Sequence, residues 1–200
     1  MTIAAEKAID GRQARSARTR AAVAQAMLDC IHDGALRPSA KSVAARAGVS
    51  ARAVFRHFEN MESLMAETTR LHLEKTLPLL PPPLTTGPQS KRVRSFVELC
   101  VAYLEPSRLV WNSGRLRMPF SPVLQESHRN LLAAWDHELK KSFASEFKAM
   151  TATIRKRRIQ ILVTMLGQDA WSELREVQGL SLEESKRTLE EATRLVLSPQ

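Results

Sequence analysis

SAKSVAARAGVSARAVFRHF, residues 39–58, predicts two short helices joined by a tight turn. Ser39 follows Pro38 and is placed to cap the free backbone amides at the start of the first helix. Gly48 stands where a residue of left-handed conformation ends a helix, and Ser50 is placed to cap the second one. This pair of helices is expected to organise the rest of the chain.

The second helix of the pair is predicted to be amphipathic. At about 100° per residue, one of its faces is apolar, and this face comprises Ala51, Val54, Phe55 and Phe58. The opposite face carries two guanidinium groups and an imidazole, and it comprises Arg52, Ala53, Arg56 and His57. Such a helix suits the major groove of DNA, where side chains near its N-terminus meet base edges. Similar helix pairs also occur in proteins that bind no nucleic acid, so the pattern alone leaves the function open.

Three segments around the turn resemble the DNA-binding domain of the TetR family of bacterial regulators. They are VAARAGVS (43–50), VFRHF (54–58) and NMESL (60–64). At the same spacing the family pattern reads I-A-x-x-A-G-V-S-x-G-T-L-Y-x-H-F-x-S/N-K-x-x-L. The resemblance covers about residues 16–65, a quarter of the chain. It implies an all-α fold, with an N-terminal three-helix helix-turn-helix DNA-binding domain and a C-terminal helical bundle for ligand binding and dimerisation.

The sequence departs from the family pattern at three places. Phe55 replaces a tyrosine whose hydroxyl usually contacts a phosphate, so that hydrogen bond cannot form. Arg52 and Ala53 replace Gly-Thr at the groove-facing start of the helix, and Met61 replaces a lysine that usually touches the DNA backbone. These changes leave the fold prediction intact and alter the set of contacts.

The residues and the resemblance together predict the DNA-contacting side chains. We expect Arg52 or Arg56 to read a base edge, and Arg18, Ser39, Lys41 and His57 to contact phosphates. The full predicted set is Arg18, Ser39, Lys41, Ser50, Arg52, Ala53, Phe55, Arg56 and His57.

Charge and composition agree with a helical protein that meets a polyanion. The net charge is +9, with +5 over residues 1–60 and +4 over residues 61–200, so basic charge is concentrated around the motif. A basic surface that is simply solvated is the alternative. Glycine occurs only seven times in 200 residues, while good helix formers are abundant.

Other functional classes find little support in the sequence. Cys30 and Cys100 lie in apolar helical contexts and are expected to be buried and reduced. We find no apolar run of the roughly 18 residues that a membrane span needs, and no signal peptide. A soluble, cytoplasmic protein without a membrane partner is expected. Catalytic motifs, a phosphate-binding glycine loop and a His pair at metal-binding spacing are also absent from the sequence, so we predict a non-enzyme without metal or cofactor.

Composition divides the chain into four regions. Residues 1–15 are predicted to form a flexible basic arm, and residues 16–77 the helix-turn-helix domain with its connecting helix. The segment PLLPPPLTTGPQ, residues 78–89, is a proline-rich linker, and residues 90–200 form the helical effector-binding and dimerisation domain. Within that domain Pro106 is expected to end a helix, residues 121–150 to form one long helix, and Ser181 with Glu184 to cap the last helix.

The two final helices, residues 152–177 and 181–197, carry apolar stripes. Together with the resemblance they predict an isologous homodimer; the alternative is that the stripes only close the core of one protomer. The resemblance also implies an unidentified small-molecule effector. Aromatic and methionine side chains suited to such a pocket, or equally to an ordinary core, are Phe96, Trp111, Met118, Trp135, Met165 and Trp171.

The resemblance thus implies a ligand-responsive repressor that binds double-stranded DNA at a palindromic operator. Two alternatives stay open. One is a helical architectural DNA-binding protein without an effector. The other is a helical ligand-binding module that has lost DNA binding, a possibility opened by the changes at Phe55 and Met61.

Overall fold

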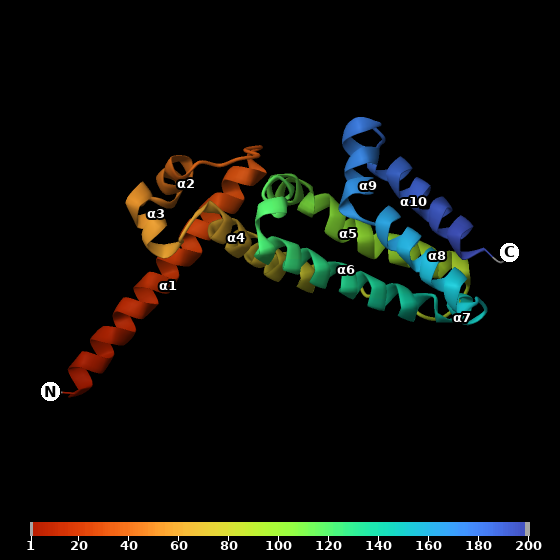
Figure 1. The fold of residues 1–200 in the computed structure, drawn as a ribbon, viewed down its shortest axis with the longest axis horizontal. Helices are drawn as coiled ribbons and strands as arrows, with labels where there is room; N and C mark the ends of the chain where they lie inside the picture. The colour runs from red at the N-terminus through yellow and green to blue at the C-terminus, as the bar shows by residue number, and fades with distance from the viewer. Residues whose placement is uncertain (1, 199–200) are drawn as a thin grey trace. The chain divides into compact units, whose positions relative to one another are not determined.

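The computed structural model describes the backbone of residues 2–198 and the side chains of residues 13–198. Every regular element in this range is helical (Figure 1), which confirms the all-α prediction. The α-helices are α1 (Thr2–His32), α2 (Ala40–Ala47), α3 (Ala51–His57), α4 (Met61–Thr76), α5 (Gln89–Arg115), α6 (Pro122–Ser142), α7 (Ala144–Lys148), α8 (Ala152–Met165), α9 (Gln168–Ser172) and α10 (Leu182–Leu197). Short 3-10 turns cover Leu77–Leu79 and Met118–Phe120, and a π-helical turn covers Glu173–Val177. No helix in the described range is both long and apolar enough to cross a lipid bilayer.

Two compact units divide the chain. The N-terminal unit runs to Lys75 and also contains Leu109–Leu124, and the C-terminal unit contains Thr76–Arg108 and the chain from Gln125 onward. The sequence had placed residues 109–124 in the second domain. They join the first because Val110 and Leu124 are buried in its core. A three-helix core is small and needs added apolar surface, which α4 and this segment supply.

Local capping signals fix the helix-turn-helix within the N-terminal unit. The Ser39 hydroxyl accepts the Ser42 amide at 3.0 Å, and Ser42 returns the bond to close a capping box. Gly48 has φ 67° and ends α2 in the left-handed region, where any other L-residue is strained. The Ser50 hydroxyl accepts the Ala53 amide at 3.2 Å and so begins α3. All three predicted helix-end residues are confirmed.

The apolar sides of α1–α4 meet in one core. Its fully buried members include Val23, Met27 and Ile31 from α1, Val43 from α2, Val54 from α3, and Leu64 and Met65 from α4. Phe58, just beyond α3, is only 2% exposed. This core holds α3 by one side and leaves its other side free.

The first helix starts much earlier than the sequence suggested. We expected a flexible arm up to residue 15 and a helix from residue 16, whereas α1 begins at Thr2. The segment before residue 16 is rich in Ala, Glu, Lys, Gln and Arg, which favour helix, and its one glycine costs only about 1 kcal/mol.

Three predicted helices are also wrong in extent. The predicted helix over residues 152–177 is interrupted between α8, which ends at Met165, and α9, which begins at Gln168. Pro106 lies inside α5 rather than ending a helix. It removes one backbone donor, but both Pro106 and Ala102, four residues earlier, are exposed, so water can reach the carbonyl left without its partner. The predicted long helix over residues 121–150 is broken at Phe143, which separates α6 from α7.

The C-terminal unit packs its helices around an aromatic core. Fully or almost fully buried members include Val97, Cys100, Leu104, Leu139, Phe143, Phe147, Leu162, Trp171 and Leu189. Helix α10 begins with the predicted capping box of Ser181 and Glu184 and packs along α8. Both cysteines of the chain are buried and free, as predicted.

A buried arginine joins three segments of this unit. The Arg92 guanidinium donates to the Glu146 carboxylate at 2.9 Å, to the Ser142 carbonyl at 2.7 Å and to the Gly87 carbonyl at 3.1 Å. Its Cζ also lies 5.7 Å from the centre of the Phe143 ring. The start of α5 is thereby fastened to the α6–α7 junction and to the residues before α5.

Candidate functional site

Helix α3 presents a polar face that its burial pattern defines. Val54 is 0% exposed, while Arg52 and Arg56, one turn apart, are both exposed. Phe55 is 50% exposed, and Ala51 is exposed too. The predicted apolar face was therefore partly wrong: Val54 and Phe58 anchor the helix, and Phe55 stands at the outward side beside the two arginines.

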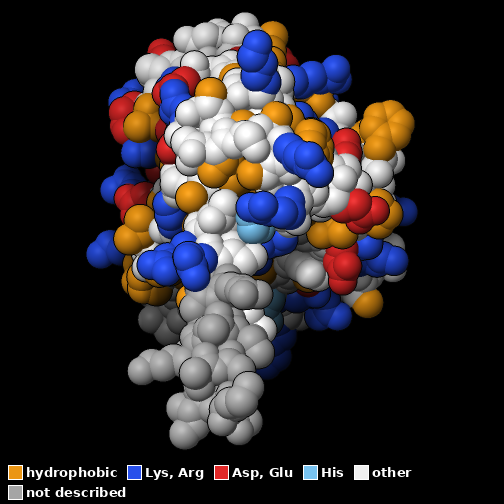
Figure 2. All heavy atoms as spheres, turned by 90° about the vertical axis from the view of Figure 1, so that its left-hand side faces the viewer, with side chains coloured by type: hydrophobic (Ala, Val, Ile, Leu, Met, Phe, Trp, Pro, Cys, Tyr) orange, Lys and Arg blue, Asp and Glu red, His pale blue; other side chains and the backbone are white. Residues whose placement is uncertain are grey.

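The outward side of α3 is a shallow hollow lined by Ser50, Arg52, Ala53, Phe55 and Arg56. Figure 2 views the molecule from the side on which α2 and α3 lie in Figure 1. Lys and Arg side chains run across the middle of this view, while Asp and Glu side chains gather toward its edges. An exposed helix side with two guanidinium groups and an aromatic ring fits the major groove of DNA, which admits an α-helix and offers base edges.

The predicted phosphate-contacting residues divide into two groups. Arg18 and Lys41 are exposed, and Arg18 donates to the Ala14 carbonyl of its own helix at 3.3 Å. Both can reach an external anion. Ser39 is exposed, but its hydroxyl is already engaged in the capping box of α2.

His57 does not have the placement that we predicted. Its Nδ1 lies 3.5 Å from the Ser16 hydroxyl of α1, and its Nε2 is shielded from solvent. The ring thus packs between α3 and α1. A helix of only seven residues depends on such contacts with neighbouring helices for its stability. A phosphate contact from this side chain is not supported.

Sequence reasoning did not foresee the position of Arg20. Its guanidinium, in a half-buried side chain, contacts the end of α3 and Glu67 of α4. The sequence gives no signal for this, because Arg20 is one of several arginines near the start of the domain and none of its partners is near it in the chain.

The residues predicted to line an effector pocket are divided between the two units. Phe96 and Trp135 meet edge to face with ring centres 6.3 Å apart. Trp171 instead donates its indole N–H to Glu105 at 2.8 Å, and Met165 is the last residue of α8. Trp111 and Met118 lie in the N-terminal unit.

One aromatic residue of this region was missed. Tyr103 is 7% exposed, and its ring centre lies 5.8 Å from that of Trp135. Burial raises the pKa of Tyr103 to about 12, so its hydroxyl stays protonated at neutral pH.

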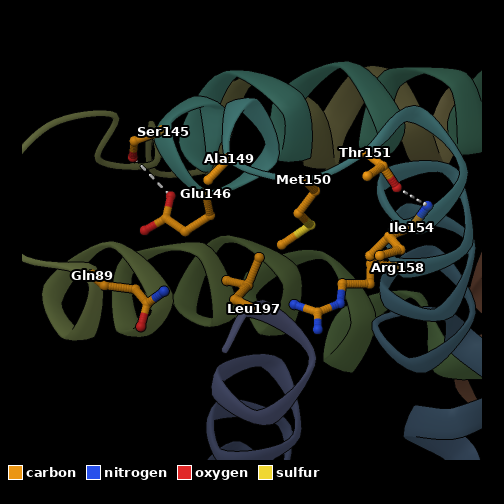
Figure 3. A pocket seen from close by; sticks show the side chains of 9 residues that line it. All are labelled: Gln89, Ser145, Glu146, Ala149, Met150, Thr151, Ile154, Arg158 and Leu197. Atoms are coloured by element: carbon orange, nitrogen blue, oxygen red, sulfur yellow. Dashed lines mark hydrogen bonds between the residues drawn. The ribbon is translucent and has the colours of Figure 1, made fainter. Parts of the chain in front are cut away.

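A pocket of about 440 Å³ opens elsewhere in the C-terminal unit (Figure 3). It is lined by Gln89, Ser145, Glu146, Ala149, Met150, Thr151, Ile154, Arg158 and Leu197. Its size is within the range of small-molecule sites, and it combines apolar side chains with a few polar groups. None of the six predicted pocket residues is among those that line it.

Residues 31–68 match the model of a family described as bacterial regulatory proteins, tetR family. The match spans the end of α1, both helices of the motif and the first half of α4. The N-terminal unit therefore contains a DNA-binding domain of the TetR type. This match supports a DNA-binding transcriptional regulator, in which α3 is the second helix of the helix-turn-helix.

The fold over most of the chain is similar to that of a solved structure. A crystal structure of a transcriptional regulator from Rhodococcus sp. Rha1 is similar, with a TM-score of 0.69 and 21% sequence identity over 89% of this chain and 95% of that one. At this identity the likeness concerns the fold alone. No curated protein sequence matches the chain.

Lys41 offers a test of phosphate contact by this TetR-family domain. We expect Lys41→Ala to weaken binding to every DNA sequence alike, because a phosphate contact carries no sequence information. The plot of log affinity against log salt concentration should become shallower by about 0.9. Lys91→Ala, which removes an exposed lysine from the C-terminal unit, is the matched control. An equal change of slope in the two variants would assign the effect of Lys41 to overall charge.

Proposed function

We propose that this TetR-family protein is a ligand-responsive repressor that binds a palindromic operator as a homodimer in the cytoplasm. The observation that carries the DNA-binding part is the outward pair Arg52 and Arg56 on a helix whose opposite side, at Val54, is buried. A dimer places two such helices about 34–36 Å apart, one turn of the duplex. Enrichment of duplexes from a random-sequence library by the purified protein tests this. Recovery of a palindromic sequence is the expected result, and recovery of no preferred sequence contradicts the proposal.

The outer surfaces of α8 and α10 support a dimer. Ile161 on α8 is 45% exposed and Leu195 on α10 is 69% exposed, although both are large and apolar. The two helices pack together in the C-terminal unit. A second copy that pairs the same two helices would cover these side chains in an isologous interface.

Replacing Leu195 with glutamate is expected to yield a monomer at micromolar concentration. A carboxylate at the centre of an apolar interface loses its hydration without gaining a partner. Sedimentation velocity measures the change. Val123→Glu is the control, since Val123 is 59% exposed but belongs to the N-terminal unit. A wild-type protein that already sediments as a monomer would contradict the dimer.

The ligand-responsive part of the proposal is supported by the pocket in Figure 3 and by the aromatic group of Phe96, Tyr103 and Trp135, of which Phe96 and Tyr103 are buried. An effector changes DNA affinity only if it binds one conformation more tightly than the other. The coupling in such proteins is typically about 1–3 kcal/mol. A metabolite screen by thermal shift, followed by DNA-binding measurements with each stabilising compound, tests for it.

A further inference from the structure

We propose that Arg20 of α1 and Glu67 of α4 form a clamp that holds the C-terminal end of the recognition helix α3 in its DNA-binding orientation. This inference rests on the proposed function, because it assigns a role in DNA recognition to two residues through their contacts with α3 and with each other. The clamp also links α4 to the end of α3 through the side chain of Arg20.

Three contacts meet at one guanidinium group. Arg20 Nη1 donates to the His57 carbonyl, the last of α3, at 2.6 Å. Its Cζ lies 4.3 Å from the ring centre of Phe58, which ends the helix and is almost fully buried. Its Nη2 lies 3.5 Å from Glu67 Oε2 in the middle of α4. Arg20 therefore contacts the end of α3 and α4 at the same time.

The end of α3 needs such a contact. The last carbonyls of any helix have no partner within the helix, and a cation there is favoured by the helix dipole. A helix of seven residues is also too short to be stable by itself, so outside contacts set its direction. Ser50 caps its N-terminal end, and Arg20 fixes its C-terminal end.

Glu67 is held in the charged state that the clamp requires. Arg70 donates to it at 2.8 Å, and this hydrogen bond, with the nearby charges of Arg70 and Arg20, holds the pKa of Glu67 below its usual range. Arg70 also pairs with Glu74. Residues 67, 70 and 74 lie on one face of α4, and a shift of α4 would move the carboxylate that Arg20 contacts.

A direct phosphate contact is the competing role for Arg20. The two roles predict different effects of Glu67→Gln on DNA binding. If Arg20 and its neighbours act only by attracting phosphates, removing the Glu67 carboxylate strengthens binding to all DNA and leaves the ratio of the affinities for specific and non-specific DNA unchanged. If the clamp orients α3, the same change weakens the preference for specific DNA. Glu74→Gln is a matched control, because it removes the same charge from the same face and also loses a contact to Arg70, but has no contact with Arg20 in the described structure.

The experiment uses the full-length protein and two fluorescein-labelled duplexes, one recovered from a random library by the wild type and one with its sequence scrambled. Fluorescence anisotropy gives the ratio of the two affinities. We expect Glu67→Gln to lower this ratio about two- to fivefold, the range for one exposed ion pair. Arg20→Met should lower it about tenfold or more, because it also removes a charge-assisted hydrogen bond, and Glu74→Gln should leave it unchanged. An unchanged or increased ratio in Glu67→Gln overturns the clamp.

Hydrogen exchange gives a second measurement that needs no DNA. Amides of residues 51–58 should exchange faster in Arg20→Met than in the wild type, while amides of residues 40–47 keep their rates and the melting curve confirms a folded protein. Unchanged exchange in α3 overturns the clamp. If the wild type recovers no sequence from the library, the proposed function fails, and the exchange measurement still decides whether Arg20 orients α3.

Discussion

Arg92→Met is expected to lower the free energy of unfolding by about 3–5 kcal/mol, the usual cost of removing one partner of a buried ion pair. The side chain of Arg92 is only 7% exposed and that of Glu146 only 13%. Methionine fills similar space, so the loss comes from leaving the carboxylate and the Ser142 and Gly87 carbonyls without their donor. Urea unfolding followed by circular dichroism measures the change.

Arg94→Met is the control for this prediction. Arg94 lies two residues away on α5, is 71% exposed and is 3.9 Å from Glu190. Such a pair contributes at most about 1 kcal/mol. The double variant Arg92→Met with Glu146→Leu should recover part of the lost stability, because no buried charge then lacks a partner. Equal losses in Arg92→Met and Arg94→Met would contradict the structural role of the buried pair.

The same pair sets how stability responds to acid. Burial by itself raises the pKa of Glu146, but hydrogen bonds from Arg92 and Ser145 outweigh it and lower the pKa from 4.5 to about 2. A carboxyl group with a lowered pKa in the folded state stabilises the fold above its unfolded pKa. That contribution is lost as the pH falls from 4.5 toward 2. Unfolding curves repeated at pH 3 should therefore show a smaller difference between the wild type and Arg92→Met than curves at pH 7.

Features that depend on neighbouring residues in the chain were predictable from the sequence. The caps at Ser39, Gly48, Ser50 and Ser181 are such features, because the atoms that satisfy the helix ends lie within four residues. They were sufficient to predict the helix-turn-helix and the final helix. The all-α class followed from composition and from the resemblance to the TetR family.

Which side of α3 is buried was harder to predict. Only seven residues define its period, and its buried side depends on where α1 and α4 lie. Val54 and Phe58 were placed correctly, but Phe55 turned out to be half exposed and His57 to pack on α1. Periodicity alone cannot decide which residues at the edges of the apolar stripe, such as Phe55 and His57, are buried.

Long-range polar contacts could not be predicted at all. Arg20 and His57 are 37 residues apart in the chain, and Arg92 and Glu146 are 54 apart. Nothing in the local sequence distinguishes these arginines from the solvated ones. The same limit applies to an effector pocket, since aromatic residues fill cores and line cavities alike, and only the packing of several helices separates the two roles.

Alanine at both Arg52 and Arg56 is expected to abolish the preference for specific DNA. Both side chains are exposed, one turn apart, on the outward side of α3, and neither forms an ion pair with another described residue. Each bidentate contact between a guanidinium group and guanine contributes about 1–3 kcal/mol of discrimination. Anisotropy with the selected and the scrambled duplex measures the loss.

Lysine at both positions separates base reading from charge. It keeps the two positive charges but lacks the planar fork that a guanidinium group offers. We expect Arg52→Lys with Arg56→Lys to bind scrambled DNA as the wild type does, with nearly the same dependence on salt, and to lose most of its preference for the selected sequence. A lysine variant that kept the preference would show that charge alone suffices at these positions. If the alanine variant also kept the preference for the selected sequence, that sequence would have to be read by another part of the domain.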